Sequence, residues 1–223
     1  MKHLDKKRKS RRSLIGYIFL FLGLGLGLSI VGRLLWSNFV SEREAKSKTI
    51  SIRQEWSTPS LEKSSSSSAG FAFLYIPRLQ DSVWELPISH GTDSSKLLAG
   101  TGHYPKTALP GESGNFAVAG HRSGNGEPFA DFDRLRQGDR IVIETKDKWF
   151  IYVLDQDIQV EPDEVWVLNR NPAGFANATG SDKLITLTTC TPRYGSTGRW
   201  IWWGHLSEVR PKDSPPFDMR RWD

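Results

Sequence analysis

The sequence predicts an all-β domain, either a barrel or a sandwich, that follows a single N-terminal transmembrane helix. Residues 71–210 contain about eight short apolar runs separated by turn residues, which is the spacing of a barrel or a sandwich. Residues 14–32 are uncharged and mostly apolar, as a membrane-spanning helix requires. Because a single stretch within 71–210 has helical spacing, only one or two short helices are expected there.

The N-terminal apolar run is long enough to cross a bilayer. Its 19 residues span about 28 Å at about 1.5 Å per residue, close to the thickness of the hydrocarbon core. Arg33-Leu34-Leu35-Trp36 follows directly, and no small-x-small cleavage site lies there. The pattern therefore favours an uncleaved signal anchor over residues 14–36 rather than a cleaved signal peptide.

Basic residues gather before this run. Residues 1–13 hold 7 of the 30 lysines and arginines and 1 of the 25 acidic residues, which leaves 23 basic against 24 acidic residues in the rest of the chain. Such a leader stays in the cytoplasm, so a single-pass cell-membrane protein with its folded domain outside is expected. Because the folded part has no excess of positive charge, nucleic-acid binding is excluded, and membrane lipid is the expected partner of the leader.

Two polar segments flank the predicted β-domain, 71–210. Residues 37–70 are charged and then serine-rich, with five serines at 64–68. This composition cannot bury enough apolar surface to fold alone, so it predicts a linker, within which a short helix over 41–56 can form. The tail, 211–223, is polar and interrupted by proline.

The strands are expected where β-branched and aromatic residues form short runs. These runs lie at 71–76, 83–88, 115–120, 140–144, 148–154, 164–168, 183–189 and 199–209. One stretch, 127–135, differs: a proline near its start, apolar residues at i, i+3 and i+6, and Gly138 beyond its end predict a short helix.

Three polar side chains stand at the ends of predicted strands. Cys190, the single cysteine of the chain, closes a β-branched run just before Thr191-Pro192. His121 closes another run, and Arg199 opens the last one. A lone cysteine is often only a small buried side chain, and an arginine at a strand start is often only a surface cation. The three together favour covalent catalysis by a thiol.

These residue types suit an attack on an amide. Cysteine is the best side-chain nucleophile near neutral pH, because part of it is already thiolate. A histidine whose pKa is near neutrality can protonate the departing amine. A guanidinium keeps its charge, so it can stabilise the negative oxygen that develops. The sequence therefore predicts Cys190 as nucleophile, His121 as acid and Arg199 as the stabilising cation.

The other histidines are weaker candidates. His3 lies in the basic leader, and His90 and His205 are expected to be structural, which leaves His103 as the alternative to His121. Two histidines and a cysteine can bind zinc, but the sequence has no His-x-x-x-His or Cys-x-x-Cys pattern. Neither a metal nor another cofactor is expected.

These motifs resemble those of the sortase family. They are Gly120-His121-Arg122, Thr188-Thr189-Cys190-Thr191-Pro192 and, nine residues after the cysteine, Arg199. The stretch at 102–115 is similar to class E sortases of high-GC Gram-positive bacteria. The resemblance covers nearly all of 71–210, and it implies a closed eight-stranded β-barrel and a cysteine transpeptidase on the outer face of the membrane.

The resemblance also implies a role for each residue. Cys190 would cut a Leu-(Ala or Pro)-x-Thr-Gly sorting signal between Thr and Gly and form a thioacyl enzyme. His121 would act as acid and then base, and Arg199 would hold the substrate backbone and its oxyanion. An amine of a peptidoglycan precursor would then take the acyl group, which joins a surface protein to the cell wall. Class E members are associated with Ala at the second position, so Tyr104 is the leading substrate-binding candidate and Thr189 a weaker one.

Two alternatives stay open. Pilus-polymerising sortases share these motifs but commonly carry an Asp-Pro-aromatic lid and a second membrane helix at the carboxyl end, which this sequence lacks. A catalytically inactive, membrane-tethered binding barrel would show the same strands and would tolerate Cys190→Ser. Calcium-activated sortases use several carboxylates before the catalytic histidine, whereas this loop offers only Glu112, so no calcium requirement is expected.

The last predicted strand is unusually aromatic, with tryptophan at 200, 202 and 203. Alternation places Trp200 and Trp202 on the face opposite Arg199. We expect them to pack against the linker or the barrel exterior, or else to form a platform for a partner or lipid headgroups.

Overall fold

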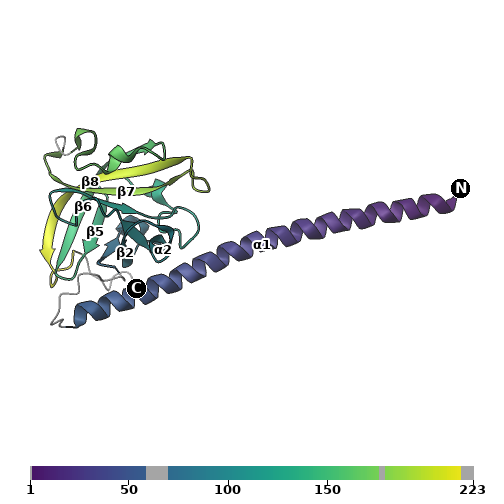
Figure 1. Ribbon diagram of the computed structural model, residues 1–223, viewed down its shortest axis with the longest axis horizontal. Coiled ribbons are helices and arrows are strands. Elements are labelled where there is room, and N and C mark those ends of the chain that lie inside the picture. The colour runs from purple at the N-terminus through teal and green to yellow at the C-terminus, as the bar shows by residue number, and fades with distance from the viewer. Residues whose placement is uncertain (1, 59–69, 176–178, 217–223) are drawn as a thin grey trace.

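The computed structural model describes residues 2–58, 70–175 and 179–216, and it shows a closed barrel rather than a sandwich. Eight strands run around it in the order β1-β2-β3-β4-β7-β8-β6-β5 (Figure 1). They are β1 (Ala72–Tyr75), β2 (Leu86–His90), β3 (Thr101–His103), β4 (Gly114–Ala119), β5 (Arg140–Glu144), β6 (Lys148–Val160), β7 (Lys183–Thr191) and β8 (Gly198–Pro211). β2 and β3 are parallel, as are β4 and β7, and the other neighbours are antiparallel. The predicted all-β fold is confirmed.

Two of the strand predictions are wrong in detail. The run at 164–168 forms the 3-10 helix η3 (Val165–Leu168), and β3 has no counterpart among the predicted runs. β3 has only three residues with Gly102 in the middle, so no apolar run marks it. In η3, Val167 is buried and Val165 is 71% exposed. The buried apolar side chains of η3 therefore pack on the outside of the barrel, and the segment does not form a strand.

The short helix predicted over 127–135 is confirmed only in part, because a three-residue 3-10 helix, η2 (Phe132–Arg134), forms there and the rest of the stretch is not helical. Phe129, Phe132 and Leu135 are all buried in the barrel core. Their spacing thus reflects a turn-rich segment that closes one end of the barrel. Further short helices within the described residues include α2 (Ser94–Leu97), η1 (Pro77–Leu79) and η4 (Pro172–Gly174).

β7 and β8 separate two apolar clusters. Successive side chains of a strand alternate between faces. Leu187 and Trp202 belong to the cluster inside the barrel, whereas Leu184 and Trp203 lie on the outer face, where η3 and η4 cover them. Trp200 also packs against the inner cluster. The expectation that Trp200 and Trp202 lie on the barrel exterior or form a platform is therefore wrong, because the barrel interior offers them more apolar contact.

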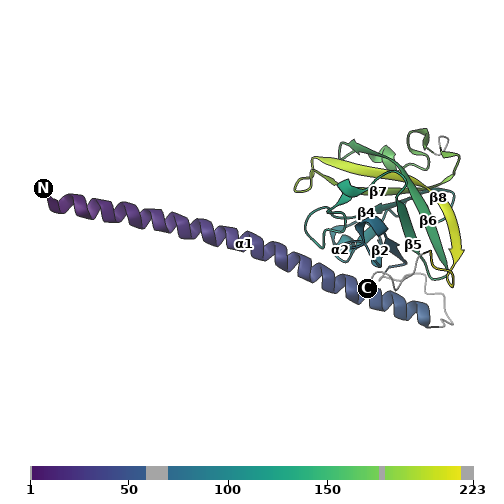
Figure 2. The ribbon, with the colours of Figure 1, turned by 180° about the vertical axis from the view of Figure 1, so that it is seen from behind.

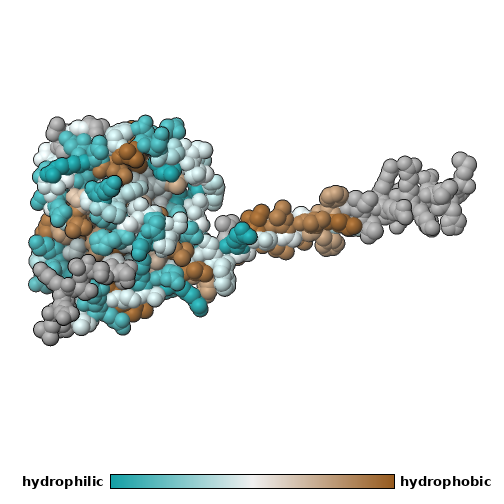
Figure 3. Space-filling view, viewed as in Figure 1, coloured by the Kyte–Doolittle hydropathy of each residue, from teal (hydrophilic) through white to brown (hydrophobic). Residues whose placement is uncertain are grey.

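The helix α1 (Lys2–Ser57) is continuous, but its two halves have different surroundings. The large apolar side chains from Tyr17 to Leu28 are exposed and form the brown stretch in Figure 3. By length and composition this part of the helix could span a membrane. Towards its C-terminal end, α1 runs alongside the barrel near β2 and α2 (Figures 1 and 2).

The segment predicted as a linker over 37–70 is helical as far as Ser57, which agrees with the short helix expected over 41–56, although the helix is longer and continuous with the apolar stretch before it. Ile52 of α1 is fully buried in a cluster that includes Phe73 of β1. Residues of this composition do not fold alone, but the barrel supplies the apolar surface against which the helix packs. The five serines at 64–68 lie outside the described residues.

An ion cluster around the buried Glu144 holds the end of α1 against the barrel. Arg53 donates to Glu144 Oε1 at 2.5 Å and Oε2 at 2.7 Å, and to Glu85 Oε1 at 2.6 Å. Glu144, which is 1% exposed, also accepts from the Tyr75 hydroxyl at 2.5 Å and from Lys212. Burial raises the pKa of the Glu144 carboxyl, but the hydrogen bonds from Arg53, Lys212 and Tyr75 outweigh it, so the net pKa is lowered.

Loss of this cluster should destabilise the protein. Arg53→Ala is expected to lower the free energy of unfolding by about 2 kcal/mol, because it leaves a buried carboxylate with fewer donors. The pKa of Glu144 is held below its usual value of 4.5. The difference in free energy of unfolding between wild type and variant is therefore fully present above about pH 4.5, and it is lost as the pH falls through the lowered pKa. Urea denaturation of the full chain in detergent, followed by tryptophan fluorescence, measures both effects.

Arg43→Ala is the matched control, because the Arg43 guanidinium lies over Phe39 of the same helix. It should leave stability within about 0.5 kcal/mol of the wild type. Equal stability of Arg53→Ala and Arg43→Ala at neutral pH would contradict a stabilising role for the Arg53 cluster.

Candidate active site

The pairing of β7 with β8 places Cys190 directly opposite Arg199. Residues paired in this way point to the same face of an antiparallel sheet, with Cβ atoms about 4.5–5.5 Å apart. Both side chains are half-buried. Arg199 Nη1 also donates to the carbonyl of Ser196 at 3.2 Å and of Gly198 at 2.9 Å, which ties the guanidinium to the β7–β8 turn. The residue paired with Cys190 is therefore a cation whose guanidinium is held by the β7–β8 turn.

The parallel pairing of β4 with β7 brings His121 to the same end of the sheet. Ala119 pairs with Thr188, and the Gly120 N–H donates to the Thr188 carbonyl at 3.1 Å. His121 follows at once, level with Cys190 on the neighbouring strand. The three residues predicted from the sequence are thus brought together at the ends of β4, β7 and β8.

Thr189 lies on the other face of β7. Its side chain is buried, and its hydroxyl donates to the carbonyl of Gly120 at 2.8 Å. Because side chains alternate along a strand, Thr189 points away from the face of Cys190. Its place favours a role in holding the turn before His121 over the predicted substrate contact.

The surroundings of His121 favour its neutral form. Burial lowers the pKa of the imidazole, because it removes water from the charged form. Asn125 Nδ2 lies 3.4 Å from Nε2 of the ring, and the His121 carbonyl accepts from the Phe129 N–H at 3.0 Å. These contacts fix both the backbone and the ring of His121.

Arg122 is a site residue to which the sequence assigned no role. It is 8% exposed, and its guanidinium lies 4.8 Å from the Trp200 ring centroid. It donates to Thr191 Oγ1 at 3.4 Å and to Asp133 Oδ1 at 3.3 Å. Arg122 therefore fastens the segment of His121 to β8 and to the end of β7. Its position directly after His121 in the Gly-His-Arg motif is the sequence feature that could have pointed to it.

Tyr104 reaches the same face as the thiol. Its hydroxyl lies 3.0 Å from Thr188 Oγ1, and Thr188 stands two residues before Cys190 on β7. Ala117 and Ala119 of β4 are the neighbours of β7 on this face, and their small side chains keep the floor of the site open. The position fits the predicted substrate contact for Tyr104.

His103 does not belong to the site. It is buried, its Nε2 lies 3.0 Å from both the Ala108 carbonyl and Thr107 Oγ1, and it stacks on Phe116. Burial lowers its pKa. Across the residues described, no group of three His, Cys, Asp or Glu side chains could hold a metal ion.

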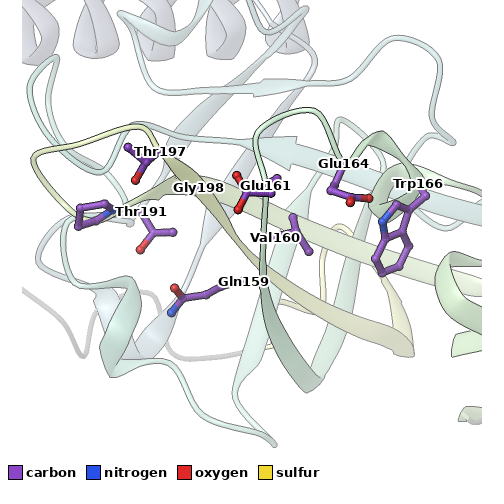
Figure 4. A pocket seen from close by; sticks show the side chains of 9 residues that line it. Gln159, Val160, Glu161, Glu164, Trp166, Thr191, Thr197 and Gly198 are labelled. Atoms are coloured by element: carbon purple, nitrogen blue, oxygen red, sulfur yellow. The ribbon is translucent and has the colours of Figure 1, made fainter.

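A pocket of about 610 Å³ lies between the end of β6, the following loop and the β7–β8 turn, and Thr191, the residue after Cys190, is part of its lining. Figure 4 shows Thr191 and Thr197 on one side of it and Trp166 on the other. Glu161 and Glu164 also line it, so its lining favours a cationic group over an anion.

A family model described as a sortase domain matches residues 74–207. The barrel is that of a sortase, and the chain belongs to the sortase family.

Two of the similar relatives are class E sortases. Sortase SrtE1 of Streptomyces coelicolor is 38% identical over 209 residues, which are 89% of this chain and 58% of SrtE1. Sortase SrtE2 of the same organism is 33% identical over 227 residues, covering 93% of this chain and 88% of SrtE2. The chain therefore spans less than two thirds of the length of SrtE1 but most of SrtE2.

Solved structures agree. Sortase E from Streptomyces avermitilis superposes with a TM-score of 0.58 at 40% identity, over 66% of this chain and 95% of that one. Sortase E1 from Streptomyces coelicolor, solved with a tripeptide in its active site, superposes with a TM-score of 0.59 at 40% identity, over 66% of this chain and 94% of that one.

Proposed function

We propose that the protein is a membrane-anchored class E transpeptidase that cuts a Leu-(Ala or Pro)-x-Thr-Gly sorting signal and joins the surface protein carrying it to a peptidoglycan precursor amine. The observation that carries the proposal is the register that sets Cys190 opposite Arg199, with His121 at the adjacent strand end. A nucleophile, a proton carrier and a fixed cation on one face are what acyl transfer through a thioester needs.

The first half of the reaction forms the acyl enzyme. Cys190 Sγ bonds to the threonine carbonyl carbon, and the Thr–Gly bond breaks after the tetrahedral intermediate has formed. His121 takes the thiol proton as Sγ attacks and gives it to the departing glycine amine. Arg199 stabilises the oxyanion throughout, because its guanidinium stays charged at any working pH.

The second half releases the product. The acceptor amine attacks the thioester carbon, His121 takes a proton from that amine, and the Cys190 thiolate leaves. The new amide joins the surface protein to the acceptor. The enzyme returns to its starting state, with no metal or other cofactor in the proposed cycle.

The position of α1 supports a site at the outer membrane surface. Ser37 of α1 contacts Asn125 in the loop after His121, and Ser37 directly follows the predicted anchor, 14–36. With the basic leader in the cytoplasm, the active site lies outside the cell and close to the lipid headgroups. An acceptor held at the membrane is then within reach.

The test is peptide exchange by the full-length chain in detergent micelles. Matched Leu-Ala-x-Thr-Gly and Leu-Pro-x-Thr-Gly peptides are supplied with an amine, and both the exchanged product and the acyl adduct on the protein are measured by mass. We expect both peptides to react, with the alanine peptide preferred. A protein that forms neither product nor adduct with either peptide would be an inactive binding barrel.

Tyr104→Phe tests the origin of that preference. Removal of the hydroxyl breaks the contact with Thr188, which is expected to change the ratio of kcat/KM for the two peptides by about 3-fold to 10-fold, the size of one hydrogen bond. Tyr194→Phe, on an 81% exposed tyrosine of the β7–β8 turn, should leave the ratio unchanged. An unchanged ratio in Tyr104→Phe would remove this residue from the specificity site.

A further inference from the structure

The loop after β4 is clamped onto α1. The Asn125 N–H donates to Ser37 Oγ at 3.1 Å, and the Ser37 hydroxyl donates to Asn125 Oδ1 at 2.9 Å. One residue further along both segments, the Gly126 N–H donates to Asn38 Oδ1 and Asn38 Nδ2 donates to Glu127 Oε1, both at 3.2 Å. Four hydrogen bonds therefore join one turn of the helix to the loop that follows the catalytic histidine.

The loop has a backbone that needs such support. The φ angles of Gly124, Asn125, Gly126 and Glu127 are all positive, at 68°, 52°, 80° and 45°. Glycine adopts this region freely, whereas a residue with a side chain pays about 1 kcal/mol or more. A Cβ atom on Gly126 would lie 3.2 Å from Cβ of Ser41, so α1 sits directly against the glycine backbone.

The Ser37 hydroxyl decides which way the Asn125 amide faces. Its oxygen accepts the Asn125 N–H and its single proton goes to Asn125 Oδ1. The amide nitrogen Nδ2 is then the atom that lies 3.4 Å from His121 Nε2. An amide N–H can donate only to an unprotonated ring nitrogen, so this arrangement stabilises the neutral imidazole with its proton on Nδ1.

We propose that Ser37 and Asn125 are positioning residues for His121: through them the anchor helix orients the ring and holds it neutral at rest. The inference rests on the proposed function, in which His121 is the acid and base. It makes α1 a part of the active site, because the turn of α1 that directly follows the predicted anchor sets the resting state of the proton carrier.

The elements packed around His121 carry charged groups of both signs. They are Arg122 in the same loop, the Glu127–Arg193 pair at 3.0 Å that links this loop to the β7–β8 turn, Arg199 on β8, the Cys190 thiol on β7, and Glu42 on α1, which pairs with Lys46. Burial lowers the pKa of His121, and the Asn125 amide acts in the same direction because it stabilises the neutral form. Loss of the amide donor therefore raises the pKa.

The test is the titration of His121 in the full-length protein in detergent micelles, followed by NMR of isotope-labelled histidine. The His121 signal is assigned from its loss in His121→Gln. In Ser37→Ala the amide is free to turn its oxygen towards the imidazolium, so the His121 midpoint is expected to move to higher pH. The acidic limb of the kcat/KM profile is expected to move with it, since His121 must be neutral in the free enzyme to take the thiol proton.

Ser37→Thr keeps the hydroxyl, so the titration midpoint of His121 is expected to stay at its wild-type value. Ser51→Ala is the matched control, because Ser51 is an exposed serine of α1 whose hydroxyl donates to the Ser47 carbonyl at 3.0 Å. Asn125→Gly tolerates the positive φ and should raise the midpoint, and Ser37→Ala added to it should have no further effect.

The two proposals fail in different ways. An unchanged His121 midpoint in Ser37→Ala would overturn the positioning role, whatever the activity of the variant. A raised midpoint supports that role by itself. Absence of peptide exchange and of an acyl adduct in the wild type, with the midpoint still raised in Ser37→Ala, would overturn the proposed function and leave the positioning contact in place.

Discussion

Cys190→Ala is expected to lower the rate of peptide exchange by about 10⁵-fold or more, because removal of a covalent nucleophile abolishes the thioester route. The wild type should gain the mass of the acyl group on incubation with peptide, and the variant should not. Mass spectrometry of the intact protein, with exchange measured in parallel, checks both expectations.

Alanine is close to cysteine in size and Cys190 is only half-buried, so the fold of the variant should be unchanged. Equal urea midpoints for the two proteins provide the control. Cys190→Ser should also be inactive, since a serine hydroxyl lacks the acidity of a thiol. Exchange at the wild-type rate in either variant would show that another group attacks the substrate.

Arg199→Ala is expected to lower kcat/KM by about 10²-fold to 10³-fold, the usual loss when one oxyanion-stabilising donor is removed. The variant should still form an acyl enzyme, but slowly, because Cys190 and His121 remain. Arg199→Lys should recover only part of the loss, since an ammonium keeps the charge but lacks the planar fork of donors. Steady-state kinetics with one peptide over a range of pH values measures the effect.

Arg210→Ala is the matched control for Arg199, because it lies at the other end of β8 and pairs with Glu208 at 2.7 Å. It should leave kcat/KM within about twofold, as expected for an exposed ion pair. A loss of less than about threefold in Arg199→Ala would assign the oxyanion to another donor.

The candidate site could be predicted from the sequence because its residues stand in short local patterns. Cys190 and His121 each close a β-branched or apolar run, and the eight residues between Cys190 and Arg199 match a strand end, a turn and a strand start. The structure aligns these strand ends at one edge. The catalytic roles of the three residues stay predictions until the variants above are measured.

Other parts of the site could not be read from local patterns. Arg122 lies over Trp200, and Thr189 turns inward to Gly120. The amide of Asn125 depends on Ser37, 88 positions earlier in the chain. No periodicity or composition marks such contacts, because each one joins two segments that the sequence presents separately.

The sequence by itself determined the all-β domain, the apolar stretch of the N-terminal helix and the three polar residues at strand ends. The alternation of side chains, the charge and the length of an apolar run are properties of a single segment. They can therefore be recognised without knowing which other segment it packs against. Only the tertiary structure decided that 165–168 form a 3-10 helix, that β3 exists, and that the helix over 37–57 docks on the barrel. Their conformations depend on partners such as Glu144 for Arg53, and the free energy of those contacts belongs to neither segment alone.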